Sequence, residues 1–225
     1  MTENPLGAVA LFHVGPVPVS GTVVTTWGLM ATLTLFSFLV TRRLKFRPES
    51  LQAAVELAIE SIDGLISDTM KASPDRFRPL IGTLLIFLAT ANLSSILPGI
   101  DPPTAHIETA AALALIVFAS VQYYGIRSNG FWGYIAQFAK PTFIMLPLNI
   151  VAELTRTFSL MVRLFGNIMS GVFVVGIVLS LSGLLIPIPL MALDVLTGLV
   201  QAYIFTVLAM VFIGGAVGSS EEVKS

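Results

Sequence analysis

The sequence predicts an all-α, polytopic membrane protein with five membrane-embedded helical segments and one amphipathic helix on the cytoplasmic surface. Composition gives the first reason. Of 225 residues, 55% are hydrophobic and 11% are charged, and mean hydropathy is +0.89. An average soluble domain carries about 25% charged residues, so lipid must solvate most of this chain's surface. The second reason is a succession of long apolar stretches, separated by short polar segments, which together form one membrane domain over residues 1–225.

Several classes of function are excluded by what the sequence lacks. The net charge of −1 offers no electrostatic footprint for nucleic acid. There is no cysteine, and the two histidines, His13 and His106, are too far apart for a helical metal motif. The phosphate-binding motifs GxxxxGK[ST] and GxGxxG are absent. We therefore expect no cofactor, no metal and no directly bound nucleotide.

The first predicted crossing is residues 22–41, which are uncharged over a full membrane thickness. Four basic residues follow it between positions 42 and 47. The positive-inside rule then places this end in the cytoplasm and the N-terminus outside. Residues 1–20 lack the basic start of a signal peptide and are expected to form a short arm.

Residues 49–71 predict the amphipathic helix. Apolar residues recur there at helical spacing, while acidic residues fill the other positions. The apolar stripe consists of Leu51, Val55, Ala58, Ile59, Ile62, Ile66 and Met70. A helix of this kind lies along a membrane surface, here the cytoplasmic one because basic residues follow it.

Residues 79–97 and 107–125 predict the second and third crossings. The loop between them has no lysine or arginine, as is typical of an outer loop. Residues 128–141 predict a second cytoplasmic stretch.

Two unusually long segments, residues 142–182 and 187–217, complete the chain. At about 1.5 Å per residue they would span roughly 60 and 45 Å, against a hydrocarbon core of about 30 Å. Glycine and proline between them predict a turn. We therefore expect a long, strongly tilted helical hairpin, with the polar C-terminal tail in the cytoplasm.

Charged residues inside these long segments are the main functional signal. Residues 142–182 contain Glu153, Arg156 and Arg163, and residues 187–217 contain Asp194. A charge at the centre of a membrane helix costs at least about 2.5–3.5 kcal/mol. Arginine cannot reduce that cost by losing its proton.

Helical spacing groups these charges with other polar residues. Arg163 shares a stripe with Arg156, Ser159, Asn167 and Ser170, opposite the apolar Phe158, Met161, Val162 and Phe165. The last segment has a similar face made of Asp194, Thr197, Gly198, Gln201 and Phe205. We expect the two stripes to face each other, because neither suits lipid.

Structural explanations stay open for several of these residues. Asp194 could be the counter-ion of Arg163 and simply hold the hairpin together, as serine, threonine and asparagine often do between membrane helices. Glu153 and Arg156 could be a local ion pair at the cytoplasmic interface. Asp101 and Glu108 flank the outer turn and could be solvated or could mark a channel entrance.

Four stretches resemble one known family. They are SLMVRLFGNIMSG (159–171), LVQAYIFTVLAMVFIGGAV (199–217), NLSSILPGIDPPTA (92–105) and PLNIVAELTRTFSLMVRLF (147–165). The chain resembles, from about residue 45 onward, the a subunit of F-type ATP synthases, called subunit 6 in mitochondria. The pair RLFGN and QAYIF is the most specific part of this resemblance.

The resemblance implies a role for each polar residue. Arg163 corresponds to the essential stator arginine, with Asn167 and Gln201 as polar neighbours. Ser159 lines the cytoplasmic ion path, on which Arg156 also lies, and Glu153 marks its mouth. Asp194 with Gln201 serves the outer path.

The resemblance also implies partners and a location. The partners are a ring of c subunits, each with a membrane-buried carboxylate, and the b-type subunits of the peripheral stalk. The location is the inner, energy-transducing membrane, crossed several times.

This sequence departs from the family pattern at three places. Val172 stands nine residues after the arginine, where many members have an acid or histidine, so that function could have moved to Asp194. The spacing from Glu153 to Arg163 is about one helical turn shorter than in many relatives. The ELTRT form is similar to the N-type branch, and proton or sodium stays open as the coupling ion.

Two rival functions stay open on the sequence. A secondary transporter could use Arg163 to bind an anionic substrate, but it predicts an inverted repeat with broken helices, which the sequence lacks. A non-transporting scaffold subunit would give the aligned polar residues no purpose.

Overall fold

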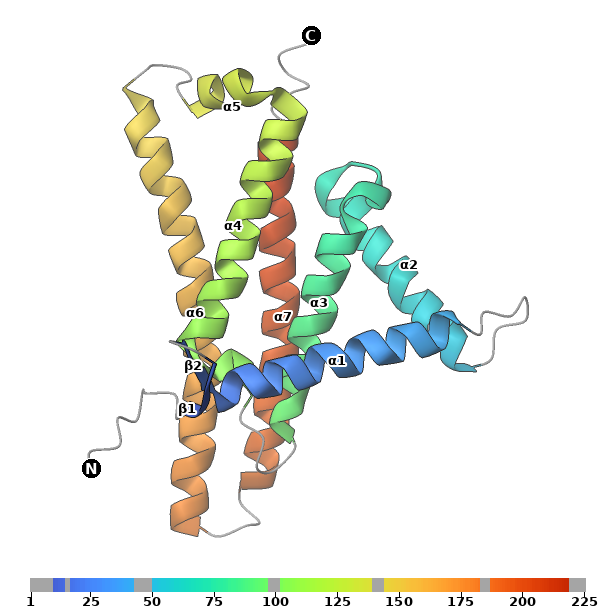
Figure 1. Cartoon of the computed structure of the whole chain (residues 1–225), viewed down its shortest axis with the longest axis vertical. Helices are drawn as coiled ribbons and strands as arrows, with labels where there is room; N and C mark the ends of the chain where they lie inside the picture. The colour runs from blue at the N-terminus through green and yellow to red at the C-terminus, as the bar shows by residue number, and fades with distance from the viewer. Residues whose placement is uncertain are drawn as a thin grey trace.

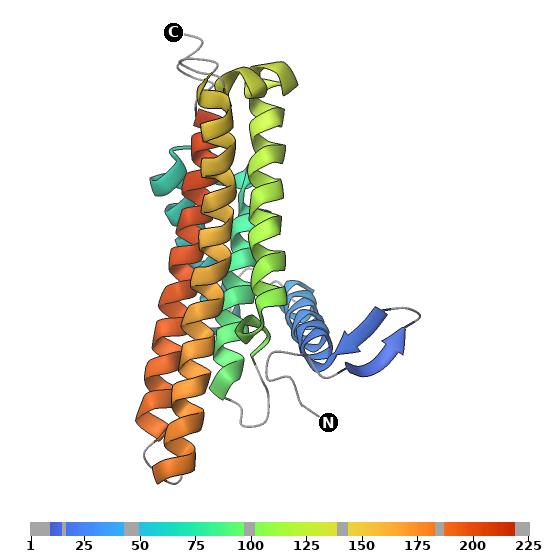
Figure 2. The same cartoon turned by 90° about the vertical axis from the view of Figure 1, so that its left-hand side faces the viewer.

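A computed structural model describes residues 10–14, 17–42, 50–96, 102–138, 144–182 and 187–218. Helices dominate these residues, and the predicted all-α membrane architecture is confirmed. Helices α3 (Arg78–Leu93), α4 (Ile107–Asn129), α6 (Met145–Ser182) and α7 (Pro187–Gly218) run alongside one another, as both overall views show (Figures 1 and 2). Helix α1 (Gly21–Thr41) crosses this bundle almost at right angles to its axis (Figure 1).

A short β-hairpin precedes α1, where the sequence predicted only an arm. Strands β1 (Ala10–Val14) and β2 (Val17–Ser20) pair antiparallel. The valines and the phenylalanine of this segment favour extended backbone. The two strands, of 5 and 4 residues, have lengths that are usual for β-strands.

Within the described ranges, four helices are long and apolar enough to cross a membrane: α1, α4, α6 and α7. The fifth apolar helix, α3, has 16 residues and continues into the 3-10 turn η2 (Ser94–Ile96). The turn η3 (Pro103–Ala105) then leads into α4. Together these helices indicate a multi-pass membrane protein.

Helix α2 (Ser50–Met70) packs against the bundle by only part of its apolar stripe. Ile62 and Ile66 are buried against α3 and α7, whereas Ala58 and Ile59 are exposed. The η1 turn (Pro74–Arg76) then reverses the chain into α3. An ion pair between Arg78 Nε and Asp63 Oδ1, at 2.6 Å, fastens the start of α3 to α2.

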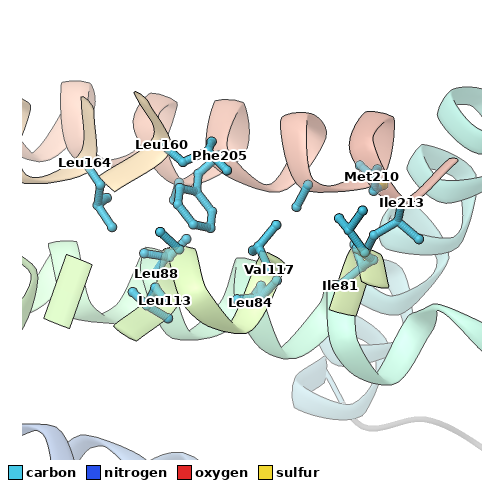
Figure 3. Packing of buried hydrophobic residues seen from close by; sticks show 14 of the residues in the cluster. Ile81, Leu84, Leu88, Leu113, Val117, Leu160, Leu164, Phe205, Met210 and Ile213 are labelled. Atoms are coloured by element: carbon cyan, nitrogen blue, oxygen red, sulfur yellow. The ribbon is translucent and has the colours of Figure 1, made fainter. Parts of the chain in front are cut away.

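The hydrophobic core lies between α3, α4, α6 and α7 (Figure 3). Its labelled members are Ile81, Leu84, Leu88, Leu113, Val117, Leu160, Leu164, Phe205, Met210 and Ile213. The spacing of three or four residues within each helix puts these side chains on one face. The core fixes how α6 and α7 are rotated, and so where their polar residues point.

The short helix α5 (Phe131–Phe138) connects the ends of α4 and α6 (Figure 1). It falls within the expected second cytoplasmic stretch. Gly130, whose φ is 72°, forms the corner between α4 and α5. Glycine adopts this left-handed conformation without the steric cost that other residues have.

A buried hydrogen-bond network holds α3 to α7. Asn92 Nδ2 donates to the carbonyl oxygen of Gly198 at 2.6 Å, and Thr104 Oγ1 donates to Asn92 Oδ1 at 2.9 Å. Asn92 is 3% exposed and Thr104 is fully buried. Gly198 permits the approach, because a Cβ there would lie 3.0 Å from Asn92 Cβ.

We predict that Asn92→Leu lowers the stability of the bundle by about 1–3 kcal/mol, because it leaves a buried hydroxyl and a buried carbonyl unpaired. The measurement is the midpoint of thermal unfolding in detergent. Thr83→Val is the control, since Thr83 is exposed and bonds only within its own helix. Equal midpoints for both variants would contradict the prediction.

Candidate functional site

Arg163 lies at the midpoint of α6, on a face turned away from the bundle. The neighbouring residues Leu160, Leu164 and Ile168 are buried in the core. Their spacing of four residues fixes the rotation of α6, and Arg163 is therefore exposed. Among the described residues, Arg163 has no hydrogen bond and no ion pair.

The face around Arg163 is a mixture of polar and apolar groups. Ser159 and Arg156 are exposed on it, as is Ser170 farther along. Val162 is exposed as well. The guanidinium of Arg156 lies 5.6 Å from the centre of the Phe212 ring of α7.

The prediction that the two polar stripes face each other is wrong for the region around Arg163. Leucine and isoleucine side chains of α6 occupy the contact with the other helices, so Ser159 and Arg163 point outward, whereas Arg156 reaches over Phe212 of α7. The stripes meet only farther along the hairpin. No ion pair joins Arg163 to Asp194 in the part of the chain that the structure describes.

Asp194 packs directly against Gly171 of α6. A Cβ at Gly171 would overlap the carboxylate oxygen Oδ1, so only glycine leaves room for this side chain. The half-buried carboxylate borders a cleft of about 230 Å³ between the two helices. The cleft is lined by Asn167, Ser170, Gly171, Val174, Val175, Leu190, Leu193, Asp194 and Thr197.

The Asn92 network adjoins the other side of Asp194. A smaller pocket there is lined by Asn92, Ser95, Pro102, Ile168, Asp194 and Gly198. The sequence reasoning missed Asn92, Ser95 and Thr104 as parts of the site, although all three lie in the quoted stretch NLSSILPGIDPPTA. The asparagine and serines at the end of this apolar segment could have indicated that these residues belong to the site. From the sequence they were assigned only to an outer loop.

Gln201 is buried, at 7% exposure, on the face of α7 that enters the bundle. Its Nε2 has no hydrogen-bond partner among the described residues. An unpaired buried amide is costly and marks a place for a partner or a water molecule. Gln201 and Arg163 form no hydrogen bond within the described parts of the chain.

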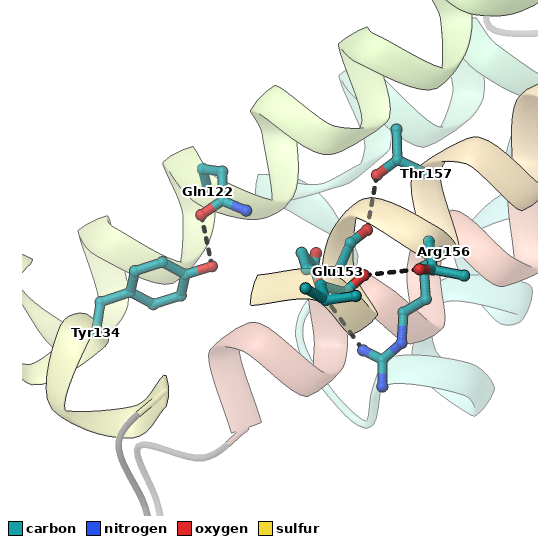
Figure 4. Close-up of polar contacts among 7 residues, drawn as sticks. Gln122, Tyr134, Glu153, Arg156 and Thr157 are labelled. Atoms are coloured by element: carbon teal, nitrogen blue, oxygen red, sulfur yellow. Dashed lines mark hydrogen bonds and ion pairs between the residues drawn. The ribbon is translucent and has the colours of Figure 1, made fainter. Parts of the chain in front are cut away.

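A second polar cluster surrounds Glu153, near the start of α6 (Figure 4). Arg156 Nη1 lies 3.5 Å from Glu153 Oε2, a local pair of the kind the sequence left open. Across from it, the hydroxyl of Tyr134 donates to Gln122 Oε1 at 2.8 Å. Sequence reasoning missed Tyr134 and Gln122, because nothing in the sequence indicates that α4 and α5 meet α6 at this point.

The remaining candidates do not join these clusters. Glu108 is exposed in the first turn of α4, and Asp101 lies outside the described residues. Val172, at a position where the resemblance leads one to expect an acid or histidine, is 40% exposed. No group of three histidine, cysteine, aspartate or glutamate side chains gathers anywhere in the described ranges.

Comparisons with known proteins show which family the chain resembles. Residues 23–214 match the family described as ATP synthase A chain. The chain is 60% identical to ATP synthase subunit a 2 of a Bradyrhizobium species (strain BTAi1), over 97% of this chain and 98% of that one. It is 43% identical to ATP synthase subunit a 2 of Pelobacter propionicus, over 96% and 95%. It is 41% identical to ATP synthase subunit a of Moorella thermoacetica, over 93% and 96%. Because the family match and these relatives extend over nearly the whole chain, the protein belongs to the family of ATP synthase a subunits.

Proposed function

We propose that this chain is the ion-conducting stator subunit in the membrane sector of a rotary ATP synthase. In this role it provides two half-channels and the arginine that couples proton or sodium flow to rotation of a ring of c subunits. The b-type subunits of the peripheral stalk hold it still. The family assignment supports the stator role in general, and the geometry around Arg163 supports the details.

The observation that carries the proposal is an arginine that lies on the outward face of a membrane helix and has no partner among the described residues. Arg163 keeps its charge under all physiological conditions. If lipid covered that face, the buried charge would cost at least about 2.5–3.5 kcal/mol of free energy. A second protein must therefore cover the face and present an anionic group to the guanidinium. A membrane-buried carboxylate on each c subunit meets this requirement.

Two polar clusters flank Arg163 along α6. Glu153 and Gly171, against which Asp194 packs, lie roughly 15 Å and 12 Å from it along the helix, at about 1.5 Å per residue. The Asp194 cluster opens into a cleft, and the Glu153 cluster lies near α5. We assign the first cluster to the outer half-channel and the second to the cytoplasmic half-channel.

Coupling follows from the cost of burying charge. A neutral carboxylic acid on the ring can pass through lipid, whereas a carboxylate cannot. Near Arg163 the fixed positive charge favours the ionised form, so the acid releases its ion into one half-channel. The next acid is loaded from the other half-channel. Because a mobile cation is repelled by Arg163, ions cross only when the ring turns.

The orientation of the helices fits this role. Helix α1 has 21 residues, roughly 32 Å at 1.5 Å per residue, which matches the membrane thickness. Its side chains are exposed along most of its length, so lipid must surround it. Helices α6 and α7 have 38 and 32 residues, roughly 57 and 48 Å at 1.5 Å per residue, so in a hydrocarbon core of about 30 Å they must lie strongly tilted. We propose five crossings, with the N-terminus outside and the C-terminus in the cytoplasm.

A transporter that binds an anionic substrate fits the geometry less well. Arg163 points outward rather than into the cleft between α6 and α7. The charged side chain that borders this cleft is Asp194, which would repel an anion. If the chain were only a scaffold subunit, nothing would offset the free-energy cost of holding the Arg163 charge in the membrane.

We predict that Arg163→Ala abolishes coupled transport, because the two half-channels are then no longer separated and ring carboxylates are not forced to ionise. The measurement is ATP-driven ion pumping by the complete synthase in lipid vesicles. Arg127→Ala, an exposed arginine at the end of α4, is the control and is expected to pump normally. Pumping by Arg163→Ala at the parent rate would reject the proposal.

We predict that Asp194→Asn slows transport strongly without stopping it, since the outer path loses its ionisable group but keeps its polar lining. Rates are measured over a range of outer pH values. The pH dependence on that side is expected to flatten. The matched control is Asp68→Asn, an exposed aspartate on α2. Unchanged rates at every pH would show that Asp194 is only structural.

We predict that Gly171→Ala reduces ion flow at least several-fold while the subunit still assembles. The added methyl group meets the far end of a flexible side chain, so Asp194 is displaced and the backbone need not move. Gly176→Ala is the control, because no atom lies within 4 Å of a Cβ at Gly176. Normal flow through Gly171→Ala, together with normal assembly, would mean that the position of Asp194 is unimportant.

A further inference from the structure

The ring of Tyr134 is tightly packed at the junction of α4, α5 and α6. Tyr134 is 6% exposed, and its ring lies directly on Gly125 of α4. A Cβ at Gly125 would overlap the ring, so a larger residue there would displace it. A side chain held this tightly presents its hydroxyl in one direction, toward Gln122 and Glu153 (Figure 4).

The hydrogen bond from Tyr134 to Gln122 decides what the phenol can offer to Glu153. A phenol has one proton to donate, and here it goes to Gln122 Oε1 at 2.8 Å. The oxygen then has only lone pairs for other neighbours. Protonated Glu153 can donate a hydrogen bond to such an oxygen through a water molecule, whereas ionised Glu153 can only repel it.

Few other groups act on the Glu153 carboxylate. On its own helix, Arg156 approaches at 3.5 Å but is 57% exposed at the side chain, whereas the Glu153 side chain is 14% exposed. Thr157 binds the backbone carbonyl of Glu153 rather than its carboxylate. From α4 the neutral Gln122 faces this cluster, and from α7 the apolar Phe212 lies under Arg156. Tyr134 is therefore the titratable neighbour from another helix among the residues described.

We propose that Tyr134, seated on Gly125 and held by Gln122, is a positioning residue that favours the protonated form of Glu153 at the cytoplasmic end of the ion path. This inference rests on the ion path proposed above. The hydroxyl sets the proton affinity of Glu153 without itself losing or gaining a proton. The cytoplasmic half-channel would then load and release ions in a pH range set partly by α5.

The ionisation of Tyr134 itself agrees with this role. Burial, and next the nearby charge of Glu153, raise the pKa of Tyr134 to about 12. The phenol thus stays neutral over the whole physiological range. Any pH dependence that it influences must therefore belong to Glu153.

The test is the pH profile of ATP-driven pumping by the complete synthase in vesicles, with the pH varied on the cytoplasmic side. Tyr134→Phe keeps the ring on Gly125 and removes the hydroxyl. We expect the pH of half-maximal pumping to move downward by roughly 0.5 to 1 unit, the size that one hydrogen bond to a carboxyl group supports. Gln122→Leu frees the phenol proton for ionised Glu153 and should move the profile in the same direction.

Two comparisons make the result specific. Tyr123→Phe is the matched control, because that hydroxyl lies on the exposed side and accepts from Arg127 at 2.6 Å. Its profile should equal that of the parent. In a Glu153→Gln background, Tyr134→Phe should have no further effect on the profile.

Three outcomes would overturn the role of Tyr134: an unchanged profile, an upward shift, or a shift that persists in the Glu153→Gln background. The proposed ion path fails in a different way. If Glu153→Gln alone pumps like the parent at every pH, Glu153 is not on the path, and both ideas fall. Slow pumping by Glu153→Gln with an unchanged Tyr134→Phe profile rejects Tyr134 alone.

Discussion

A guanidinium that cannot lose its proton stands on the outward face of α6, halfway along a helix whose surroundings are lipid. In water such a group would need no explanation. In a membrane its charge requires an anionic partner, and in the described part of the chain none is present. The rest of the structure is arranged around this constraint. The leucines and isoleucine of α6 turn Arg163 outward, and the polar residues that pack inside the subunit stay away from it.

The two polar clusters serve this arrangement because they stand on opposite sides of Arg163 along the same helix. Asp194 is positioned by a glycine of α6 and borders a cleft, next to the hydrogen-bonded Asn92. Glu153 lies where α4 and α5 close over the start of α6. In the described structure neither acid forms an ion pair with Arg163. In the proposed function, Arg163 therefore separates ions at one cluster from the other cluster.

The sequence predicted the elements well and the rotation of α6 poorly. Apolar runs, charges and glycine–proline turns located the helices, because such patterns depend on neighbours along the chain. The β-hairpin was missed. Polar spacing alone suggested that the stripes of α6 and α7 face each other, but Leu160, Leu164 and Ile168 decide the rotation by packing. The contacts of Asp194 with Gly171 and of Tyr134 with Gln122 depend on tertiary structure, which no local pattern encodes.

The most direct test of the central claim asks what covers the face of Arg163. The chain has no cysteine, so single cysteines can be placed at will. Ser159→Cys and Val162→Cys lie on the exposed face, and Leu160→Cys lies in the core. With a second cysteine beside the buried carboxylate of the c subunit, oxidation should cross-link the first two positions but not the third. Pumping should stop on oxidation and return on reduction. Absence of any cross-link from the two exposed positions in the assembled synthase would contradict the account.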